Sequence, residues 1–573
     1  MRVNDLESAV AALQRAYETG KIITDIEKFE EGDGGWIIVF SDNSTIALYN
    51  GAKGENGEQG DDGDAFFSGV DIQEEFVTFV LIDGTTFTFR KTSNIVAPKL
   101  VSMEFRSSVN PTVLIEDVAC TISDDGMVEC WIRHTVDSKL LTPHFTFDGD
   151  CVVDAEGEEV ISDDTLLDFK SPLTLTVKSG SFSKEYTIYV HSFTGLPVLW
   201  IDTENGVEIA SKDTYVNAHF TLVEDIVESS SNSKVEYDGQ IKGRGNSTWS
   251  APKKPYRIKF NSKESILGEP KDKSWVLLAN WYDKTLIRNT VAFYMGSISN
   301  LDYTPRFHYV DLMLNGEYNG TYQLGDHLKI SKNRVNVGDD GFLVEIDCKL
   351  YDSDARYFYV PHIDYAINIK DPDVEFYDDN YTYVANYINM VDNVLFSDDF
   401  KDPDNGWQKY MDIDSFVDWF LINELAKNPD AQFSTSCFMN LKRGGKLCMG
   451  PLWDFDLGFG NYWDNETHNN PEGFYIKNVS WYIQLFKDPA FISRTKERFY
   501  YFFNHKADIM NNINMNAQYI KESVIRNDGK WGNLKTGNSA NYDVWETYME
   551  EVQKLKSWIS KRFDWLKGQF DSM

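Results

Sequence analysis

The segment 423–460, NELAKNPDAQFSTSCFMNLKRGGKLCMGPLWDFDLGFG, carries the pattern that decides the fold of the C-terminal part of the chain. A helical stretch ends near Lys427 and is followed by the loop Asn428-Pro429-Asp430. Two short apolar runs then flank Gly444-Gly445, which predicts a hairpin. The hairpin ends in Trp453-Asp454-Phe455-Asp456, so two acidic loops, 24 residues apart, bracket one hairpin.

This layout resembles that of the protein kinases. There, the Asp of a catalytic loop accepts the proton of the hydroxyl acceptor, and the Asp of a later Asp-Phe-Gly motif holds Mg²⁺. Phosphoryl transfer depends mainly on positioning and on charge neutralisation, and a hard cation prefers carboxylate oxygens. Asp430 and Asp454 are therefore the predicted centre of a metal-assisted phosphoryl-transfer site.

A basic segment, KGRGNSTWSAPKKPYRIKF at 242–260, supplies the positive charge that such a site needs. Its glycine-rich loop offers backbone amides, hydroxyls and a guanidinium, and a lysine-bearing strand follows, an arrangement that several enzymes use to neutralise nucleotide phosphates. Strand alternation places Lys254, Tyr256 and Ile258 on one face and Arg257 and Lys259 on the other. The alternative is a solvated basic hairpin. The candidate phosphate-binding residues in this segment are Arg244, Asn246, Ser247, Lys254 and Lys259.

Two further segments contribute candidates. In SWVLLANWYDKTLIRNTVAFYM, 274–295, Asp283 is the expected N-cap of a helix. Arg288, one to two turns inside this helix, is a sixth candidate for cofactor binding, although pairing with Asp283 is the commoner outcome for such an arginine. In LMLNGEYNGTYQLGDHLKI, 312–330, Asn315-Gly316 predicts a hairpin turn, and Asp326 and His327 follow the returning strand.

In this order, GRGNSTW with KKPYRIKF, NWYDKTLIRN, LNGEYNGTY and PLWDFDLGFG resemble the CotH family, atypical protein kinases related to spore-coat protein H. The resemblance implies that Asp430 is the catalytic base and Asp454 the Mg²⁺ ligand, with Asp456 assisting. It also implies that Lys254 or Lys259 neutralises ATP phosphates near Arg244. Asp326 stands where the family commonly has Glu, and Ser436 or Cys437 where it often has Asn.

Three functions follow as hypotheses. The first is transfer of a phosphoryl group from ATP, with Mg²⁺ or Mn²⁺, to Ser or Thr of a protein substrate outside the cytoplasm. The second is a catalytically degenerate kinase fold that serves as a cell-surface structural protein or binds a glycan or protein ligand. The third is a metal-dependent hydrolase that uses the same carboxylates.

The chain is predicted to be multidomain. Residues 1–96 contain a short helix (5–20), two similar hairpins (Trp36–Leu48 and Val77–Phe89) and, between them, glycine at every third position from Gly51 to Gly63. This stalk-like region could oligomerise, although a surface helix and a polar linker are the simpler interpretations. Residues 97–195 are expected to form an immunoglobulin-like β-sandwich. Residues 196–573 are expected to form a large α+β, atypical kinase-like domain.

Bulk composition limits the partners and the setting. The net charge of −35 argues against a nucleic-acid partner, because phosphate backbones repel so acidic a chain. The sequence has no run of 18 or more apolar residues, so no transmembrane helix is predicted. The family resemblance and the stalk favour an extracytoplasmic protein, secreted or anchored at the cell surface. Among the six cysteines, Cys120 with Cys130 and Cys437 with Cys448 could face each other across hairpins, but buried free thiols are the favoured interpretation.

Overall fold

The computed structural model describes the chain except for residues 1, 4–5, 30–34, 50–66, 74–75, 82, 92–98, 115, 134–138, 150, 180–181, 225–233, 350–354, 465, 538–543 and 545. The glycine-triplet run, Gly51 to Gly63, falls within 50–66 and so lies outside the described residues. The chain divides into two compact units, Met1–Ser192 with Ser229–Ser231, and Phe193–Glu228 with Asn232–Met573. Within the first unit, residues 12–89 and 100–190 form separate hydrophobic cores.

The N-terminal part of the first unit packs one helix and two small sheets around a single core. Helix α1 (Leu6–Glu18) buries Leu13 against Phe40, Phe79 and Phe89 of the sheets. The first sheet has the order β1-β4-β3-β2, and the second has the order β5-β6-β7. The strands are β1 (Arg2–Val3), β2 (Ile23–Phe29), β3 (Gly35–Phe40), β4 (Thr45–Tyr49), β5 (Phe67–Ile72), β6 (Phe76–Leu81) and β7 (Thr86–Arg90). Both predicted hairpins are confirmed, because Trp36 lies opposite Leu48 and Val77 opposite Phe89.

The second part of the first unit consists of short strands around the core that includes Phe105, Cys130, Val177 and Tyr186. A six-stranded sheet (β10-β11-β18-β17-β14-β15), a three-stranded sheet (β13-β8-β9) and the pair β12-β16 surround it. The strands are β8 (Lys99–Phe105), β9 (Val118–Ala119), β10 (Thr121–Ile122), β11 (Met127–Arg133), β12 (Leu140–Leu141), β13 (His144–Asp148), β14 (Val152–Ala155), β15 (Glu158–Glu159), β16 (Leu167–Asp168), β17 (Leu173–Ser179) and β18 (Phe182–Phe193). The all-β prediction is confirmed, and the immunoglobulin-like topology stays a prediction.

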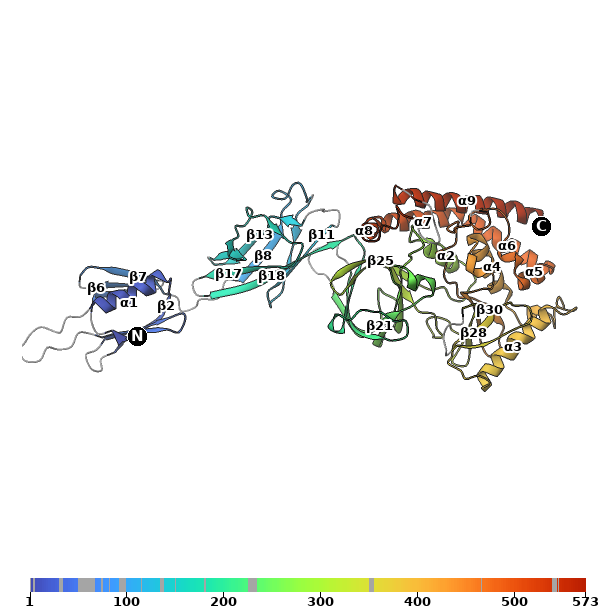
Figure 1. The fold of residues 1–573 in the computed structure, drawn as a ribbon, viewed down its shortest axis with the longest axis horizontal. Helices are drawn as coiled ribbons and strands as arrows, with labels where there is room; N and C mark the ends of the chain where they lie inside the picture. Colours follow the sequence, from blue (N-terminus) through green and yellow to red (C-terminus); the bar gives the residue numbers. More distant parts are fainter. Residues whose placement is uncertain are drawn as a thin grey trace, which may run out of the picture. The chain divides into compact units, whose positions relative to one another are not determined.

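The second unit begins with a closed seven-stranded barrel of order β19-β20-β21-β22-β23-β25-β24, closed by the parallel pairing of β19 with β24 (Figure 1). Its strands are β19 (Val198–Thr203), β20 (Val216–Val223), β21 (Lys234–Gly243), β22 (Tyr256–Glu264), β23 (Asp272–Leu278), β24 (Phe307–Leu314) and β25 (Glu317–Asp326). Side chains such as Phe220, Ile258 and Trp275 fill the barrel. Because residues alternate along a strand, the inward Tyr256 and Ile258 leave Arg257 on the outer face.

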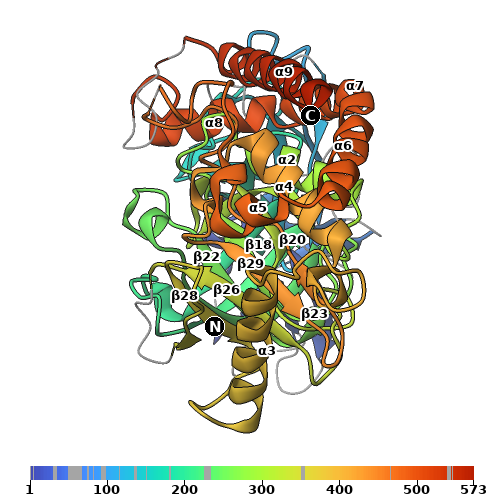
Figure 2. The same ribbon diagram turned by 90° about the vertical axis from the view of Figure 1, so that its right-hand side faces the viewer.

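A five-stranded sheet and most of the helices follow the barrel. The sheet has the order β27-β28-β26-β29-β30, with β26 (Phe342–Asp347), β27 (Arg356–Phe358), β28 (Ala366–Asp371), β29 (Cys437–Leu441) and β30 (Leu447–Met449). The helices of this unit are α2 (Arg288–Ser297), α3 (Asp379–Leu395), α4 (Ile413–Ala426), α5 (Ser480–Leu485), α6 (Pro489–Asn504), α7 (Lys506–Tyr519), α8 (Lys521–Trp531) and α9 (Tyr548–Ser572). Short 3₁₀ turns are η1 (Glu204–Gly206), η2 (Ser247–Ser250), η3 (Trp407–Lys409), η4 (Pro429–Ala431) and η5 (Ile476–Asn478). Figure 2 shows α9 and α3 at opposite ends of this unit, with the sheet between them.

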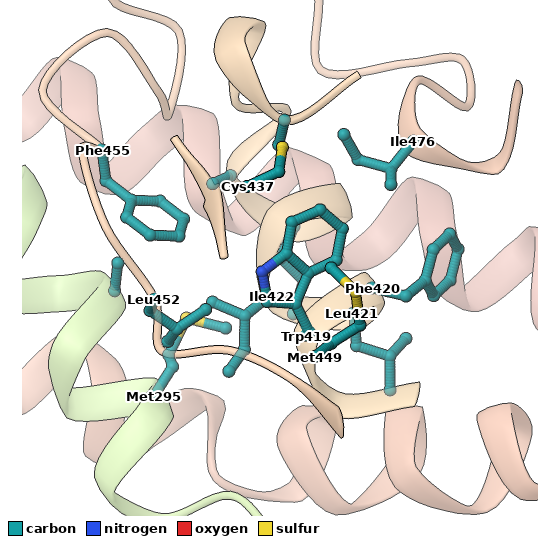
Figure 3. Packing of buried hydrophobic residues seen from close by; sticks show 14 of the residues in the cluster. Met295, Trp419, Phe420, Leu421, Ile422, Cys437, Met449, Leu452, Phe455 and Ile476 are labelled. Atoms are coloured by element: carbon teal, nitrogen blue, oxygen red, sulfur yellow. The ribbon is translucent and has the colours of Figure 1, made fainter. Parts of the chain in front are cut away.

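Helix α4 is the centre of the main hydrophobic core. It is buried on nearly every side, and Trp419, Phe420 and Ile422 pack among side chains from α2, β29 and the segment after β30 (Figure 3). Cys437 lies inside this core. The β29–β30 register pairs Cys448 with Asn440, so Cys437 and Cys448 are three rungs apart and do not face each other. In the described part of the chain, none of the helices is both long and apolar enough to pass through a bilayer.

Candidate active site

A cavity of about 440 Å³ lies in the second unit, between the barrel and the five-stranded sheet. The barrel side contributes the loop after β21, the outer face of β22 and the end of β23. The opposite side contributes β26, β28, β29, η4 and the segment after β30. The polar residues that line it are Arg244, Asn246, Ser247, Thr248, Arg257, Asn280, Tyr282, Asn289, His327, Glu345, Asp347, Lys349, Lys370, Asp373, Asp430, Thr435, Ser436, Asp454 and Asp456. Six of the sequence-predicted site residues thus meet in one cavity: Arg244, Asn246, Ser247, Asp430, Asp454 and Asp456.

Local backbone geometry holds the predicted acidic pair in place. Helix α4 ends at Ala426, and its C-cap residue Lys427, with a left-handed φ of 48°, turns the chain into η4, which carries Asp430. Asp454 also has a left-handed backbone, with φ of 61°. The Asn428 side chain donates to the Asp454 carbonyl at 3.2 Å and so ties the two acidic loops together. An αL aspartate is uncommon, and strain of this kind is typical of functional sites.

Two more asparagines fix the loop that carries Asp454 and Asp456. The Phe455 amide donates to Oδ1 of Asn289, on α2, at 2.8 Å. The Asn461 side chain donates to the Asp456 carbonyl at 2.6 Å and to the Tyr282 carbonyl at 3.0 Å. Phe455 itself is fully buried in the main core. The two carboxylates are therefore held on a loop whose backbone is bound on both sides.

Burial raises the pKa of all three carboxyl groups, and repulsion by neighbouring acids adds to this rise for Asp430 and Asp456. Burial and repulsion by Asp454 raise the pKa of Asp430 to about 7. Burial also raises the pKa of Asp454, against the opposing effect of Arg244, and burial together with Asp454 and Asp430 raises the pKa of Asp456 well above its usual range. Like charges this close favour the protonated forms unless a cation joins them. The cluster therefore gains from bound positive charge.

The carboxylate oxygens of this cluster accept few hydrogen bonds. Among the described residues, Asp454 accepts a side-chain hydrogen bond only from Ser436, at 3.4 Å, and Asp456 accepts one from the Leu457 amide. No set of three or more His, Cys, Asp or Glu residues in the described ranges forms a metal site by itself. Mg²⁺ is commonly held by one or two protein carboxylates with water and substrate phosphates. Asp454 and Asp456 fit this kind of site and do not fit a metal cage made of protein alone.

Two arginines face the acidic cluster from the barrel side. Arg244 lies with its guanidinium 5.5 Å from the ring centroid of Trp453, and Arg257 projects from the outer face of β22. Burial and the neighbouring Arg257 lower the pKa of Arg244, whereas Asp454 opposes this shift. In the described structure neither guanidinium has an ion-pair partner, and the buried Nε of Arg257 lacks a hydrogen bond. Unmet donors of this kind, in a cavity, suit an anionic ligand.

Sequence reasoning missed several cavity residues. Arg257 was assigned to a strand face but not to the site. Lys349 lowers the pKa of both Asp430 and Asp454, and Lys370 pairs with Glu345 at 3.2 Å. His327 has its pKa lowered well below the usual value by burial and by nearby arginines, so its imidazole is neutral at pH 7. Only the basic strand and the Asp-His pair gave a signal in the sequence. Lys349 and Lys370 reach the cavity through β26 and β28, which carry no recognisable motif.

The structure places three predicted phosphate-binding residues outside the cavity. The Lys254 ammonium donates to the Trp249 carbonyl at 2.7 Å, and its Nζ lies 5.2 Å from the centroid of the Trp249 ring. Lys259 is exposed on β22, two residues beyond the point where the strand borders the cavity. Arg288 is fully buried and pairs with Asp283 at 2.5 Å and with Glu551 at 2.9 Å.

Asp326 is also held by ion pairs and hydrogen bonds to neighbouring side chains. It accepts from Arg334 at 3.0 Å and from Arg306 at 2.9 Å at the end of the barrel, and the Tyr303 hydroxyl donates to it at 2.8 Å. Asp326 therefore belongs to a buried arginine–aspartate network outside the lining of the cavity.

Comparison with known proteins establishes the family. The family model described as CotH kinase protein matches residues 241–566, more than half of the chain, and the chain belongs to this family. That range contains the barrel strands β22–β25, the sheet and all three acidic residues of the cavity.

Other comparisons are weak. A DUF4623 family protein from Bacteroides eggerthii DSM 20697 aligns at 9% identity over 28% of this chain, with a TM-score of 0.14, and the match spans about half (47%) of that protein. A putative glycoside hydrolase from Bacteroides thetaiotaomicron VPI-5482 aligns at 14% identity over 52% of this chain and 89% of its own, with a TM-score of 0.17. No curated protein sequence matches significantly.

Proposed function

We propose that the cavity binds ATP with Mg²⁺ or Mn²⁺ and transfers the terminal phosphoryl group to a Ser or Thr hydroxyl of a protein, from an atypical kinase-like fold. The observation that carries this proposal is the opposition, in one cavity, of three weakly hydrogen-bonded carboxylates and two guanidinium groups without ion-pair partners. A triphosphate with a divalent cation satisfies both sides at once, because its oxygens pair with the arginines and its cation with the acids.

Asp430 is assigned the role of base. A carboxylate whose pKa is about 7 is half ionised at neutral pH and accepts a proton from a hydroxyl more readily than an ordinary aspartate. The αL turn at Lys427 and the Asn428 hydrogen bond hold it opposite the strand that carries Arg257. Because its neighbours Ser434 and Thr435 fold back onto the Asp430 carbonyl, the carboxylate is positioned by a closed turn.

Arg244 and Arg257 are assigned to the phosphates in place of the lysines expected from the sequence. Asn246 and Ser247 lie in the glycine-rich loop beside Arg244, and η2 begins at Ser247. Asp454 and Asp456 would hold the cation, which would neutralise the charge of the phosphate oxygens. Binding it would also remove the repulsion that now raises the pKa of the acidic cluster.

Incorporation of labelled phosphate tests this function. Purified protein is incubated with γ-labelled ATP and Mg²⁺ or Mn²⁺, alone and with a mixture of candidate acceptor proteins, beside Asp430→Asn and Asp454→Asn. The proposal expects label on Ser or Thr with the unaltered chain, and a loss of at least about 100-fold with either variant or with chelator. Equal label on all three proteins would reject it.

The second candidate, a degenerate kinase fold that binds a surface ligand, is supported by the small number of metal-binding groups. No three-residue metal site exists in the described ranges. Ser436, which donates to Asp454 at 3.4 Å, or Cys437 stands where the family resemblance implies an Asn. Nucleotide binding without transfer, under conditions in which the metal is saturating, would favour this candidate. Its location outside the cytoplasm stays a prediction under either function.

A further inference from the structure

A pair of thiols in the first unit lies outside everything assigned above. Cys120 is the residue at which the chain passes from the three-stranded sheet, through β9 (Val118–Ala119), to the six-stranded sheet, through β10 (Thr121–Ile122). Cys130 lies in β11, the strand paired with β10. All six cysteines are thiols in the structure.

The strand register sets these two residues opposite each other. Thr121 lies opposite Glu129 and Ile122 opposite Val128, so the next rung of the antiparallel ladder joins Cys120 and Cys130. Side chains on one rung project from the same face of a sheet. Cys130 is fully buried in the core, and Cys120 packs against the same core.

The rung is of the kind that brings side chains closest. The Ser123 amide donates to the Met127 carbonyl at 2.9 Å, and hydrogen-bonded rungs alternate with non-bonded rungs from there, which makes the Cys120–Cys130 rung non-bonded. The Cys120 amide agrees with this, because it donates to the Met103 carbonyl at 2.9 Å, away from Cys130. Cα atoms on such a rung are about 4.5 Å apart, within the range that a disulfide spans.

We propose that Cys120 and Cys130 form a cross-strand disulfide when the protein meets a disulfide oxidant, and that this bond ties the sheet-crossing residue to β11. Cys437 and Cys448 supply an internal contrast. They also belong to two paired strands, but three rungs apart, and so they have no such partner in each other.

The chemistry is thiol–disulfide exchange with a disulfide such as oxidised glutathione. The thiolate of Cys120 attacks one glutathione sulfur, which forms a mixed disulfide and releases one glutathione thiolate. The thiolate of Cys130 then attacks the Cys120 sulfur and releases the second. The protein loses two protons and two electrons, and the glutathione disulfide gains them to become two glutathione thiols.

The surroundings of the thiols set the rate. The interaction with Cys130 and burial raise the pKa of Cys120 well above the usual value, so little thiolate is present at neutral pH. Exchange in the folded protein is therefore slow at pH 7 and faster at pH 9. Formation during folding, before the core closes, is not subject to this restriction.

The test uses the full chain in glutathione redox buffers. Folded protein at pH 9, and protein refolded from denaturant in the same buffers, are treated with an alkylating reagent and digested, and the peptides are identified by mass spectrometry. The proposal expects a Cys120–Cys130 linked peptide lacking two hydrogens, with Cys437 and Cys448 alkylated. Alkylation of both Cys120 and Cys130 after refolding in oxidising buffer, or linkage of either to another cysteine, would overturn it.

Stability gives a second measurement. Because the bond closes a short loop, the oxidised protein is expected to melt about 5 °C higher than the reduced protein in the transition of the first unit. Cys120→Ser removes this difference between oxidised and reduced samples, and the matched control Cys448→Ser retains it. A difference that persists in Cys120→Ser would contradict the assignment.

Discussion

At the scale of single residues, the acidic cluster lowers the stability of the fold that holds it. A group whose pKa is raised in the folded state binds a proton more tightly there than in the unfolded chain. Asp430, with a folded pKa of about 7 against about 3.9 when unfolded, therefore supports the folded state at low pH. That contribution is lost as the pH rises through 7. A loss of folding stability of this kind is typical of sites that bind a charged ligand.

Asp430→Asn is expected to stabilise the protein at high pH, because it removes a carboxylate that is unfavourable when ionised. At pH 8 the gain is on the order of 1–2 kcal/mol after allowance for water in the cavity, or about 2–4 °C in melting temperature. Toward pH 4 the difference disappears. Melting curves of both proteins at pH 4, 6 and 8 measure it, and a variant less stable than the unaltered protein at pH 8 would be inconsistent with the raised pKa.

Arg257→Ala is expected to weaken ATP binding about 10- to 100-fold, the effect of losing one charge-assisted hydrogen-bonding group. The matched control is Lys259→Ala, two residues along the same strand face and exposed, which should leave the affinity unchanged. Isothermal titration of each variant with ATP and Mg²⁺ measures the difference. Equal weakening by both substitutions would point to a general field effect instead of a contact.

The pair Arg257 and Lys259 shows how far sequence reasoning reached at this scale. Alternation predicted correctly that the two share the outer face of one strand. It could not show that the cavity borders only the end of β22 that carries Arg257, because this depends on where the sheet docks against the barrel. For Arg288, the sequence favoured pairing with Asp283, five residues away, and the structure confirms this pair. The second partner, Glu551, lies 263 residues away and could not be predicted from the local sequence.

At the scale of elements, α9 is bound to the acidic half of the site by buried charges. Arg562 pairs with Glu424 of α4 at 2.6 Å, and its Nη1 donates to the Pro471 and Gly473 carbonyls at 2.8 and 2.7 Å. Trp558 donates to the Asn469 carbonyl from the same helix. The C-terminal helix thus fixes both α4, which precedes Asp430, and the loop after Asp456.

Arg562→Met is expected to destabilise the second unit by about 3–5 kcal/mol, because it leaves Glu424 buried without its partner. The double variant Arg562→Met with Glu424→Gln should recover a substantial part of this loss. Chemical denaturation of the single and double variants measures both values. If the double variant were as unstable as Arg562→Met alone, lost packing and lost carbonyl contacts, not the unpaired charge, would be the cause.

Helix positions followed from the sequence where the apolar period was long and uninterrupted. The sequence predicts helices at 378–396 and 412–427, and these match α3 and α4 within about one residue at each end. The sequence predicts a single helix at 488–512, but the structure has two helices there, α6 and α7, which divide at His505. No Gly or Pro marks this break, and the second helix turns back to pack against α2 and α9, which no local pattern records.

At the scale of the whole molecule, the two compact units have separate hydrophobic cores and the cavity belongs entirely to the second. A chain that starts at Phe193 is therefore expected to fold and to keep its affinity for ATP within about twofold of the full chain. Circular dichroism melting and a nucleotide titration of the shortened protein check this. Loss of its cooperative melting transition would show that the first unit is needed for the second to fold.

The central claim, that Asp454 and the arginines form one site for a metal–nucleotide complex, is tested most directly by calorimetric titration of a non-hydrolysable ATP analogue with and without Mg²⁺. The titration is run on the unaltered chain, on Asp454→Asn and on the Lys259→Ala control. The account predicts binding to the unaltered chain and the control that tightens at least about tenfold with Mg²⁺, and no such Mg²⁺ effect in Asp454→Asn. Absence of nucleotide binding to the unaltered chain with saturating Mg²⁺, or an equal Mg²⁺ effect in Asp454→Asn, would contradict it.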